Sequence, residues 1–223
     1  NVINNGTLRL LDGANQAIDA LSGTGTITIL STSGRLPTNL SLGNNDGGAT
    51  FSGTITGSSP VLSLTKNGTG TQILTGANTY TGATTINAGT LQIGNGFSVG
   101  TLGFNASVYS AVSVAANANL DFYRNNIYTI ANSISGAGAV NFSGTAVSSQ
   151  SNYYLTGNNS SLSGNINVSS SRIGIVAANQ VGTAAITINS GASLYTNGGF
   201  TLNNALSLAG NGWLENTYGQ LGA

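Results

Sequence analysis

The sequence predicts an all-β fold in which the chain coils into a β-solenoid of about nine to eleven rungs. Roughly twenty short apolar clusters are separated by Gly, Asn or Ser, and no segment keeps a helical period over four turns. A sandwich or barrel would use fewer and longer strands, whereas each strand of a solenoid is only one side of a rung. At ~4.8 Å per rung, a single domain spanning 1–223 would form a rod about 45 to 50 Å long.

The first sixty residues supply four strand candidates, at 7–11, 26–30, 40–42 and 50–52. The run from Thr26 to Ile29 alternates polar and apolar residues with period two, which is typical of a strand with one buried face. Asn-Gly and Asp-Gly pairs separate the candidates and favour tight turns, because Gly tolerates positive φ. We expect loops around Pro37 and Pro60, since Pro cannot donate a ladder hydrogen bond.

The stretch from Leu64 to Gly94 shows the clearest rhythm of strands and bends. Its sequence is LTKNGTGTQILTGANTYTGATTINAGTLQIG, in which glycines interrupt the apolar clusters at near-regular intervals. A strand candidate at 61–65 leads into it. The later candidates keep the same rhythm and lie at 108–114, 120–123, 127–130, 140–143, 153–155, 166–168, 173–176, 186–188, 193–195, 200–202, 206–208 and 213–214.

The composition excludes several classes of function. Only 4% of residues are charged, against about 25% in ordinary soluble domains, and the formal net charge is zero. There is therefore no long-range field to attract nucleic acid, and no charge repulsion to oppose self-association. Cys and His are absent, which excludes disulfides, thiolate zinc sites and imidazole bases, and we expect no cofactor. No apolar run approaches the roughly 18 residues of a membrane helix, so we expect no membrane insertion by this segment.

Residues 66 to 94 closely resemble the autotransporter-associated β-strand repeat of passenger domains in large secreted bacterial surface proteins. The signature positions, which we expect to build rungs and corners, are Lys66, Gly68, Gly70, Leu74, Gly76, Asn78, Tyr80, Gly82, Ile86, Gly89 and Leu91. Gln72 and Ala83 stand where that family more often has Leu or Thr and Gly. Looser similarity at 6–29, 155–168 and 180–210 extends the resemblance over much of the chain.

This resemblance implies a right-handed parallel β-helix that is exported and displayed outside the cell, and it does not imply an enzyme. Passengers of this kind are usually followed by a membrane anchor. We therefore expect the chain to be either a segment of a longer protein or a released molecule. Neither terminus shows an obvious amphipathic cap, so we expect open rung edges at both ends, which invite strand addition.

Catalysis is an alternative function, because polysaccharide lyases and hydrolases also have parallel β-helix folds. The positions of the acidic residues indicate whether a catalytic pair could form. The acids are Asp12, Asp19, Asp46, Asp121 and Glu215, and no two fall at an obvious same-face spacing. The Asn-Asn-Asp-Gly-Gly sequence around Asp46 predicts local capping of a turn. Asp121 and Arg124 bracket a strand end, where we expect a solvated pair.

The isolated basic residues do not indicate a lyase site. Lys66 and Arg172 stand alone in the sequence, whereas lyase bases lie within clusters of acids and bases. Lys66 is a signature position of the repeat, and we expect it at a corner or on the surface.

Tyrosines concentrate in the second half of the chain, with Tyr80 the only one before position 109. Candidate contact aromatics are Tyr153, Tyr154, Tyr195 and Trp213. One interpretation is a face that stacks on sugars or binds a partner. The other, which the pattern favours, is aromatic stacking between successive rungs together with a lateral contact.

The sequence favours a non-enzymatic extracellular structural protein, either a surface rod or the subunit of a filament that assembles with itself end to end or laterally. The alternative is an adhesin segment that binds glycan or a host surface through the tyrosine-rich half. A carbohydrate-active enzyme is less favoured, because it requires two converging acids. Threonine rows such as Thr24, Thr26 and Thr28 are typical of ice-binding solenoids, but their spacing is not kept from rung to rung.

Overall fold

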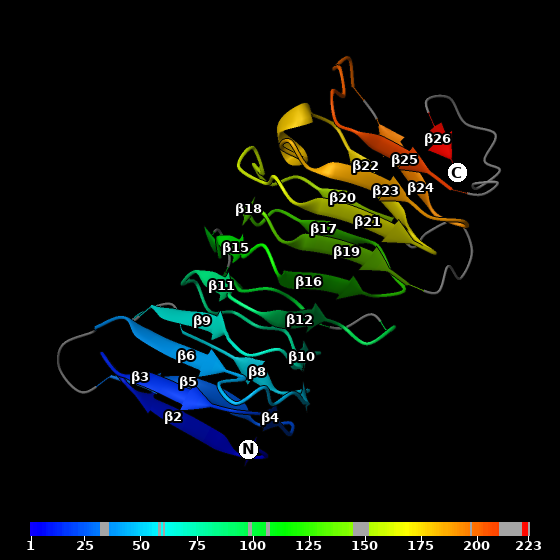
Figure 1. The fold of residues 1–223 in the computed structure, drawn as a ribbon. Coiled ribbons are helices and arrows are strands. Elements are labelled where there is room, and N and C mark those ends of the chain that lie inside the picture. Colours follow the sequence, from blue (N-terminus) through cyan, green and yellow to red (C-terminus); the bar gives the residue numbers. More distant parts are fainter. Residues whose placement is uncertain are drawn as a thin grey trace.

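The computed structural model describes residues 1–31, 36–57, 59, 61–97, 100–105, 108–144, 152–196, 198–209 and 220–222. Within these ranges the protein is an all-β parallel solenoid whose only helical element is a 3-10 turn at Ala178–Gln180. Strands stack in chain order along one axis, and the two chain ends lie at opposite ends of the stack (Figure 1). The predicted fold class is therefore confirmed.

Ten parallel strands form the longest column of the solenoid. The pair β1–β4 continues through a bridge between Gly23 and Phe51 into an eight-stranded sheet, so the column defines nine turns. Its strands are β1 (Val2–Ile3), β4 (Leu21–Ser22), β7 (Thr50–Phe51), β10 (Thr71–Leu74), β12 (Gly89–Ile93), β16 (Ala118–Tyr123), β19 (Ala139–Ser143), β21 (Asn165–Ser169), β23 (Ala185–Ile188) and β25 (Leu206–Leu208).

Two further columns close each rung. The second contains β2 (Thr7–Leu11), β5 (Thr26–Leu30) and β8 (Thr54–Ile55), then β17 (Tyr128–Ile130), β20 (Asn152–Leu155), β22 (Arg172–Ile175) and β24 (Ser193–Thr196). Backbone hydrogen bonds from Thr79 to Ile55 and from Phe104 to Asn78 continue the column beyond β8. The third contains β3 (Asn15–Ile18), β6 (Thr38–Leu42), β9 (Leu62–Lys66), β11 (Thr84–Ile86), β15 (Val112–Val114) and β18 (Ile134–Gly136).

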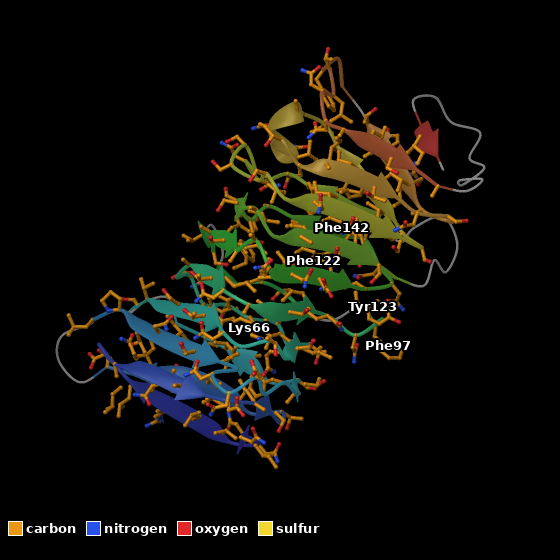
Figure 2. All side chains as sticks on the ribbon, viewed as in Figure 1. Lys66, Phe97, Phe122, Tyr123 and Phe142 are labelled. Carbon is orange, nitrogen blue, oxygen red and sulfur yellow. The ribbon has the colours of Figure 1, made fainter. Side chains whose placement is uncertain are left out.

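Inward side chains of the first column stack into a continuous core. Leu74, Ile93, Phe122, Phe142, Val168 and Ile188 follow one another in register on successive rungs, and all are wholly buried. The rings of Phe122 and Phe142 stack at 5.4 Å between centroids with nearly parallel planes (Figure 2). Such pairs contribute about 0.5–1.5 kcal/mol beyond the burial of their area, so the core strengthens the stacking of rungs.

Rung length varies while the core register is kept. Thr71 pairs with Thr90, 19 residues later, whereas Thr90 pairs with Asn119, 29 residues later. The extra residues leave the ladder as surface loops. A longer loop between rungs costs little free energy as long as the inward-facing side chains of the two strands still stack.

The strand expected at 108–114 is divided into two. Its first part, β14 (Val108–Tyr109), pairs antiparallel with β13 (Phe104–Asn105), and its second part is β15, which belongs to the third column. The rings of Phe104 and Tyr109 stack across the hairpin, 4.4 Å apart, which stabilises a local pairing that interrupts the parallel order. The candidate at 200–202 is also not a strand, and the one at 213–214 lies outside the described residues.

The two ends of the stack differ. At the C-terminal end β26 (Gln220–Gly222) pairs antiparallel with β24 and covers its edge, which corrects the expectation that both ends are open. At the N-terminal end β2 and β3 begin their sheets, and the side chains of Ile3 and Leu11 are 75% and 53% exposed.

Candidate functional site

Lys66 lies at a corner inside the solenoid, so of the two expected positions, a corner or the surface, the structure contains the corner. It ends β9 and is wholly buried. Its Nζ donates hydrogen bonds to the carbonyl oxygens of Asn67, of Gly68 at 2.8 Å and of Ala88 at 3.4 Å. Asn67 and Gly68 belong to the corner that follows β9, and Ala88 belongs to the same corner one rung later. The ammonium therefore satisfies carbonyls that the turn leaves without strand partners.

The corner around Lys66 is built from glycines. Gly68 has φ +60, a conformation that L side chains rarely adopt, and a Cβ at Gly43 would lie 3.1 Å from the Lys66 Nζ. Burial lowers the pKa of Lys66, and the nearby charge of Asp46 partly opposes that effect. The site is a capped corner in which the cation is held by carbonyl oxygens.

Buried asparagines take the corresponding role on the other side of the rungs. The side chain of Asn78 accepts from the amide of Ile55 at 2.9 Å and donates to the carbonyl of Thr101 at 2.8 Å, so it joins three successive rungs. Asn159 repeats this arrangement with Ile134 and Gln180. Asn132 and Asn204 also donate to carbonyls about one rung away.

Of these asparagines, the sequence analysis identified only Asn78. A signal was present, because Asn78 and Asn132 both precede an apolar residue by two positions and a glycine by four.

Gln72, which departs from the family pattern, has a structural explanation. Its side chain faces inward and is wholly buried. The amide accepts from the Leu21 N–H at 3.2 Å and donates to the Leu21 and Ala49 carbonyls at 2.8 and 2.9 Å. Because β7 begins only at Thr50, the glutamine supplies hydrogen bonds where the ladder below is short.

The remaining signature positions build the rungs. Leu74, Tyr80, Ile86 and Leu91 are wholly buried, and the Tyr80 hydroxyl lies 2.8 Å from the Thr84 hydroxyl. The signature glycines mark points where neighbouring rungs approach closely. A Cβ would lie 2.5 Å or less from an atom of the adjacent rung at Gly68, Gly70, Gly76, Gly82 and Gly89. The signature residues thus form corners and core and do not converge on a ligand cavity.

Arg124 is a second buried cation that the sequence analysis did not place in the core. Its Nη1 donates to the Gly100 carbonyl, and its Nε donates to the Asn126 side chain at 3.1 Å. The guanidinium also lies 4.1 Å from the centroid of the Tyr128 ring. The expected pair with Asp121 does not form, because Asp121 instead accepts from Asn141 at 2.6 Å on the outer face.

Two acids meet at one corner, which the sequence spacing did not indicate. The Asp19 carboxylate accepts from the amides of Asn45 and Gly47 at 2.8 and 2.9 Å, on either side of Asp46. Asp46 itself accepts from the Thr69 amide, and this hydrogen bond lowers the pKa of Asp46.

The hydrogen bonds of this corner define the role of its two carboxylates. Each carboxylate accepts hydrogen bonds from backbone amides of the turn, so both serve as turn caps. Capping by Asp46 was expected and is what the structure contains. Glu215 lies outside the described residues.

The candidate contact aromatics separate into different environments. Tyr153 is wholly buried, which corrects its assignment as a contact residue, and its hydroxyl accepts from the Arg124 amide at 2.8 Å and donates to the Ser143 carbonyl at 2.6 Å. Tyr154 and Tyr195 are half-buried on the outer face of the second column. Trp213 lies outside the described residues.

Phe97 is an exposed aromatic residue that was not among the candidate contact aromatics. Phe97 is 66% exposed on the loop after β12, near Tyr123 in Figure 2. The Gly96 amide donates to the Tyr123 carbonyl at 2.8 Å, and a Cβ at Gly96 would lie 2.9 Å from the Tyr123 ring. Phe97 therefore projects from a loop whose base rests on Tyr123.

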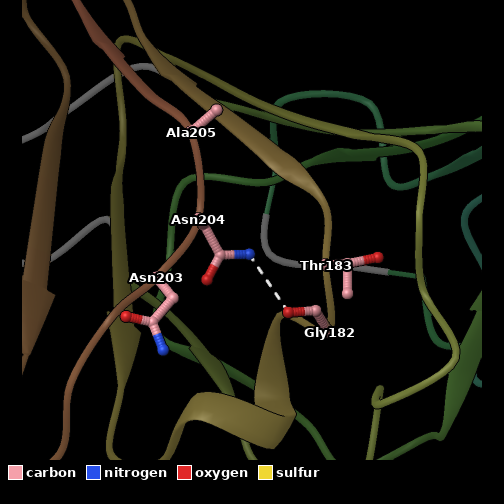
Figure 3. Close-up of a pocket in the computed structure, with 5 residues that line it drawn as sticks. All are labelled: Gly182, Thr183, Asn203, Asn204 and Ala205. Carbon is pink, nitrogen blue, oxygen red and sulfur yellow. Dashed lines mark hydrogen bonds between the residues drawn. The ribbon is translucent and has the colours of Figure 1, made fainter.

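A shallow pocket near the C-terminal end is lined by Gly182, Thr183, Asn203, Asn204 and Ala205 (Figure 3). The Asn204 side chain donates to the Gly182 carbonyl at 3.1 Å across it. With a volume of about 130 Å³ and no ionisable side chain, it is smaller than the ~300 Å³ of typical ligand pockets. It can hold water or a single small polar group.

Over the described ranges, no three His, Cys, Asp or Glu side chains come together in a way that could hold a metal ion. The same residues include no helix long and apolar enough to cross a membrane.

Comparison with known proteins supports the resemblance inferred from the repeat. Residues 64–93 match the family described as Passenger-associated-transport-repeat. A stretch of 97 residues, 43% of this chain, is 39% identical to the Adhesin BmaC autotransporter of Brucella suis biovar 1 (strain 1330), and it covers 3% of that relative's length. No solved structure matches the chain. The recognition made from residues 66 to 94 is thereby confirmed.

Proposed function

We propose that this chain is part of the extracellular passenger region of a bacterial surface protein, where it forms a non-enzymatic adhesive rod. The observation that carries the proposal is that the passenger-associated repeat lies within an unbroken column of nine turns. The similarity to an autotransporter adhesin supports the adhesive role. A solenoid suits this task because it holds its outer surface on a continuous hydrogen-bonded support.

The outer surface is built from neutral side-chain ladders. Asn67 donates to Asn44 at 2.9 Å and accepts from Asn87 at 2.8 Å, which links three rungs. Asn141 likewise donates to Asp121 and accepts from Asn167 at 2.8 Å. The asparagines of these ladders order the surface without adding charge, and Asp121 is the one acidic member. With a net charge of zero, adhesion through it should depend on close contact and little on ionic strength.

The adhesive role is tested by coating beads with the purified folded chain and counting beads retained on epithelial cell layers and on immobilised matrix glycans. Retention above albumin-coated beads, lost when the chain is heat-unfolded before coating, is the expected result. Retention equal to that of albumin beads on every surface would overturn the proposal.

A second candidate is a filament subunit, which the zero net charge favours because no charge repulsion opposes self-association. End-to-end contact between copies would be head-to-tail and would not close, so it would give a fibre. Sedimentation velocity over a wide concentration range tests this candidate, and monomers at every concentration would remove it.

A further inference from the structure

A mixed polar and aromatic patch lies on the outer face of β16. Asp121 and Tyr123 point outward there, because the residues that alternate with them along the strand are wholly buried. Gln92 on β12 and Asn141 on β19 are in register with Asp121 on the preceding and following rungs. Phe97 projects from the loop after β12, and Figure 2 shows it near Tyr123 at the same edge of the molecule. We call these five residues the Tyr123 patch.

Two aromatic rings give the patch its apolar part. The Phe97 side chain is 66% exposed, and Tyr123 is half-buried. Between them, the Gly96 amide donates to the Tyr123 carbonyl at 2.8 Å, and a Cβ at Gly96 would lie 2.9 Å from the Tyr123 ring. The missing side chain lets the loop rest on this ring, so Phe97 is held beside the same face. Rings that are positioned in advance can stack on the C–H face of a sugar at a low entropic cost.

Asp121 gives the patch its strongest hydrogen-bond acceptor. It is the only acidic residue between Asp46 and Glu215, and its side chain is half-buried. One carboxylate oxygen accepts from the Asn141 side chain at 2.6 Å. A carboxylate has two oxygens and about four acceptor positions, so Asp121 can accept hydroxyl donors while it keeps the bond from Asn141.

The amides on either side of Asp121 are held in place by the solenoid. Asn141 also accepts, at 2.8 Å, from the asparagine in register on the next rung. Gln92 donates through Nε2 to the Gly94 carbonyl at 2.8 Å, and its side-chain oxygen retains acceptor capacity. Strand geometry places the backbones of Gln92 and Asn141 about 4.8 Å from Asp121, and that of Tyr123 about 6.6 Å from it. A sugar ring that lies against Tyr123 therefore has its hydroxyl groups within reach of several fixed polar groups.

The charge of the patch favours a neutral partner. An anionic partner would meet the Asp121 carboxylate, and like charges repel. A cationic partner would gain only about 0–1 kcal/mol from a single ion pair at the surface, and the zero net charge of the chain adds no long-range attraction. A neutral sugar avoids the repulsion, and its hydroxyl groups can use each polar side chain of the patch.

We infer that the Tyr123 patch binds a neutral oligosaccharide. The C–H face of one sugar ring lies against Phe97 and Tyr123, and adjacent hydroxyl groups of that ring donate to the Asp121 carboxylate. Gln92 and Asn141 contact the hydroxyl groups that flank them. The inference deepens the proposed function and rests on it, because it names the chemistry of the surface that the rod would recognise.

The test is an NMR titration of the isotope-labelled intact chain with cellotetraose, maltotetraose and lacto-N-neotetraose. We expect at least one of these neutral sugars to cause saturable shifts that are largest at the amides of Gln92, Gly96 and Asp121. Phe97→Ala should weaken this binding about three- to tenfold. Asp121→Asn keeps an acceptor for Asn141 but removes the charge, and it should weaken binding about fivefold. Trigalacturonic acid and lysine methyl ester serve as the anionic and cationic probes.

Matched controls keep the ring or remove one elsewhere. Phe97→Tyr should preserve binding, and Tyr109→Ala, which removes a 44% exposed ring outside the patch, should leave it unchanged. Unchanged circular dichroism and melting temperature show that each variant is folded. Absence of shifts with all three sugars, shifts confined to another face, or tighter binding of either charged probe would each overturn the inference. Binding by Phe97→Ala or Asp121→Asn equal to that of the native chain would also overturn it.

Adhesion and sugar binding can fail separately. If coated beads adhere but the chain binds none of the three sugars, only the inference about the Tyr123 patch fails. If the chain binds a neutral sugar at the patch but the beads do not adhere, the inference stands and the adhesive role fails.

Discussion

Replacing Lys66 by Met removes the ammonium while keeping an unbranched apolar stem, so it isolates the contribution of the corner cap. The variant loses the hydrogen bond to Gly68 at 2.8 Å, the contact with Asn67 and the longer bond to Ala88 at 3.4 Å. Hydrogen bonds to a charged group contribute about 1.5–3 kcal/mol each, and the relieved desolvation of the buried cation offsets part of the loss. We expect a net decrease in the free energy of unfolding of about 2–4 kcal/mol.

The assay is urea unfolding followed by circular dichroism, combined with native-state hydrogen exchange. Exchange is needed because rungs contact mainly their neighbours, so unfolding of a solenoid is not guaranteed to be two-state. Protection should fall most at the Asn87 amide, which donates to the Lys66 carbonyl at 2.8 Å. Arg9→Met is the control, because Arg9 is exposed and its loss should change stability by less than about 0.5 kcal/mol.

The pH dependence gives an independent check on the buried cation. The pKa of Lys66 is lowered in the folded state, so the unfolded chain binds more protons between that lowered pKa and the ordinary value of 10.5. Within this window, the stability of the native chain relative to Lys66→Met should rise with pH. A loss below 0.5 kcal/mol, or protection lost evenly along the whole chain, would refute the assignment of Lys66 as a corner cap.

Three further predictions address other buried positions. Gly76→Ala should prevent folding or lower the melting temperature strongly, because the new Cβ would lie 1.7 Å from the Gly53 carbonyl oxygen, whereas Gly6→Ala, with no atom within 4 Å, should leave the melting temperature nearly unchanged. Asn78→Ala should lower the free energy of unfolding by about 2–4 kcal/mol in urea titrations, because it leaves buried groups of two adjoining rungs unpaired, and a native-like midpoint would contradict this. Burial raises the pKa of Tyr153, so its stabilisation is complete below the unfolded pKa of 10.0 and is lost as pH rises above it. The increase in absorbance at 295 nm on alkaline unfolding should therefore be smaller in Tyr153→Phe by the contribution of one tyrosine, and an equal increase would contradict this.

Local sequence pattern predicted most strands because they repeat a simple rule. The candidates at 7–11 and 26–30 coincide with β2 and β5, since period-two alternation and flanking glycines act within a few residues. β3 was missed because its sequence, Asn-Gln-Ala-Ile, has one large apolar residue, and its strand conformation depends on pairing with β6. The strand expected at 108–114 is divided because Tyr109 stacks on Phe104 and draws β14 into an antiparallel pair with β13, whereas β15 keeps the parallel order.

The candidate sites also divide into features that the local sequence predicted and features that depend on the tertiary structure. The distribution of tyrosines predicted that the second half of the chain is rich in aromatic residues. Whether each tyrosine faces the core or the outside depends on its position within a rung. Consecutive residues point to opposite sides of a strand, so Tyr153 is buried and its neighbour Tyr154 lies outside.

By itself, the sequence determined the solenoid class, the near-neutral surface and the repeat at 64–94, because composition and short-range periodicity encode these directly. Only the tertiary structure decided where the isolated polar residues lie. Lys66 was expected at a corner or on the surface and Arg124 in a solvated pair, yet both are buried, as is Gln72. Their partners are carbonyls of adjacent turns and rungs, and stacking alone creates the unsatisfied corners that make burying these side chains favourable.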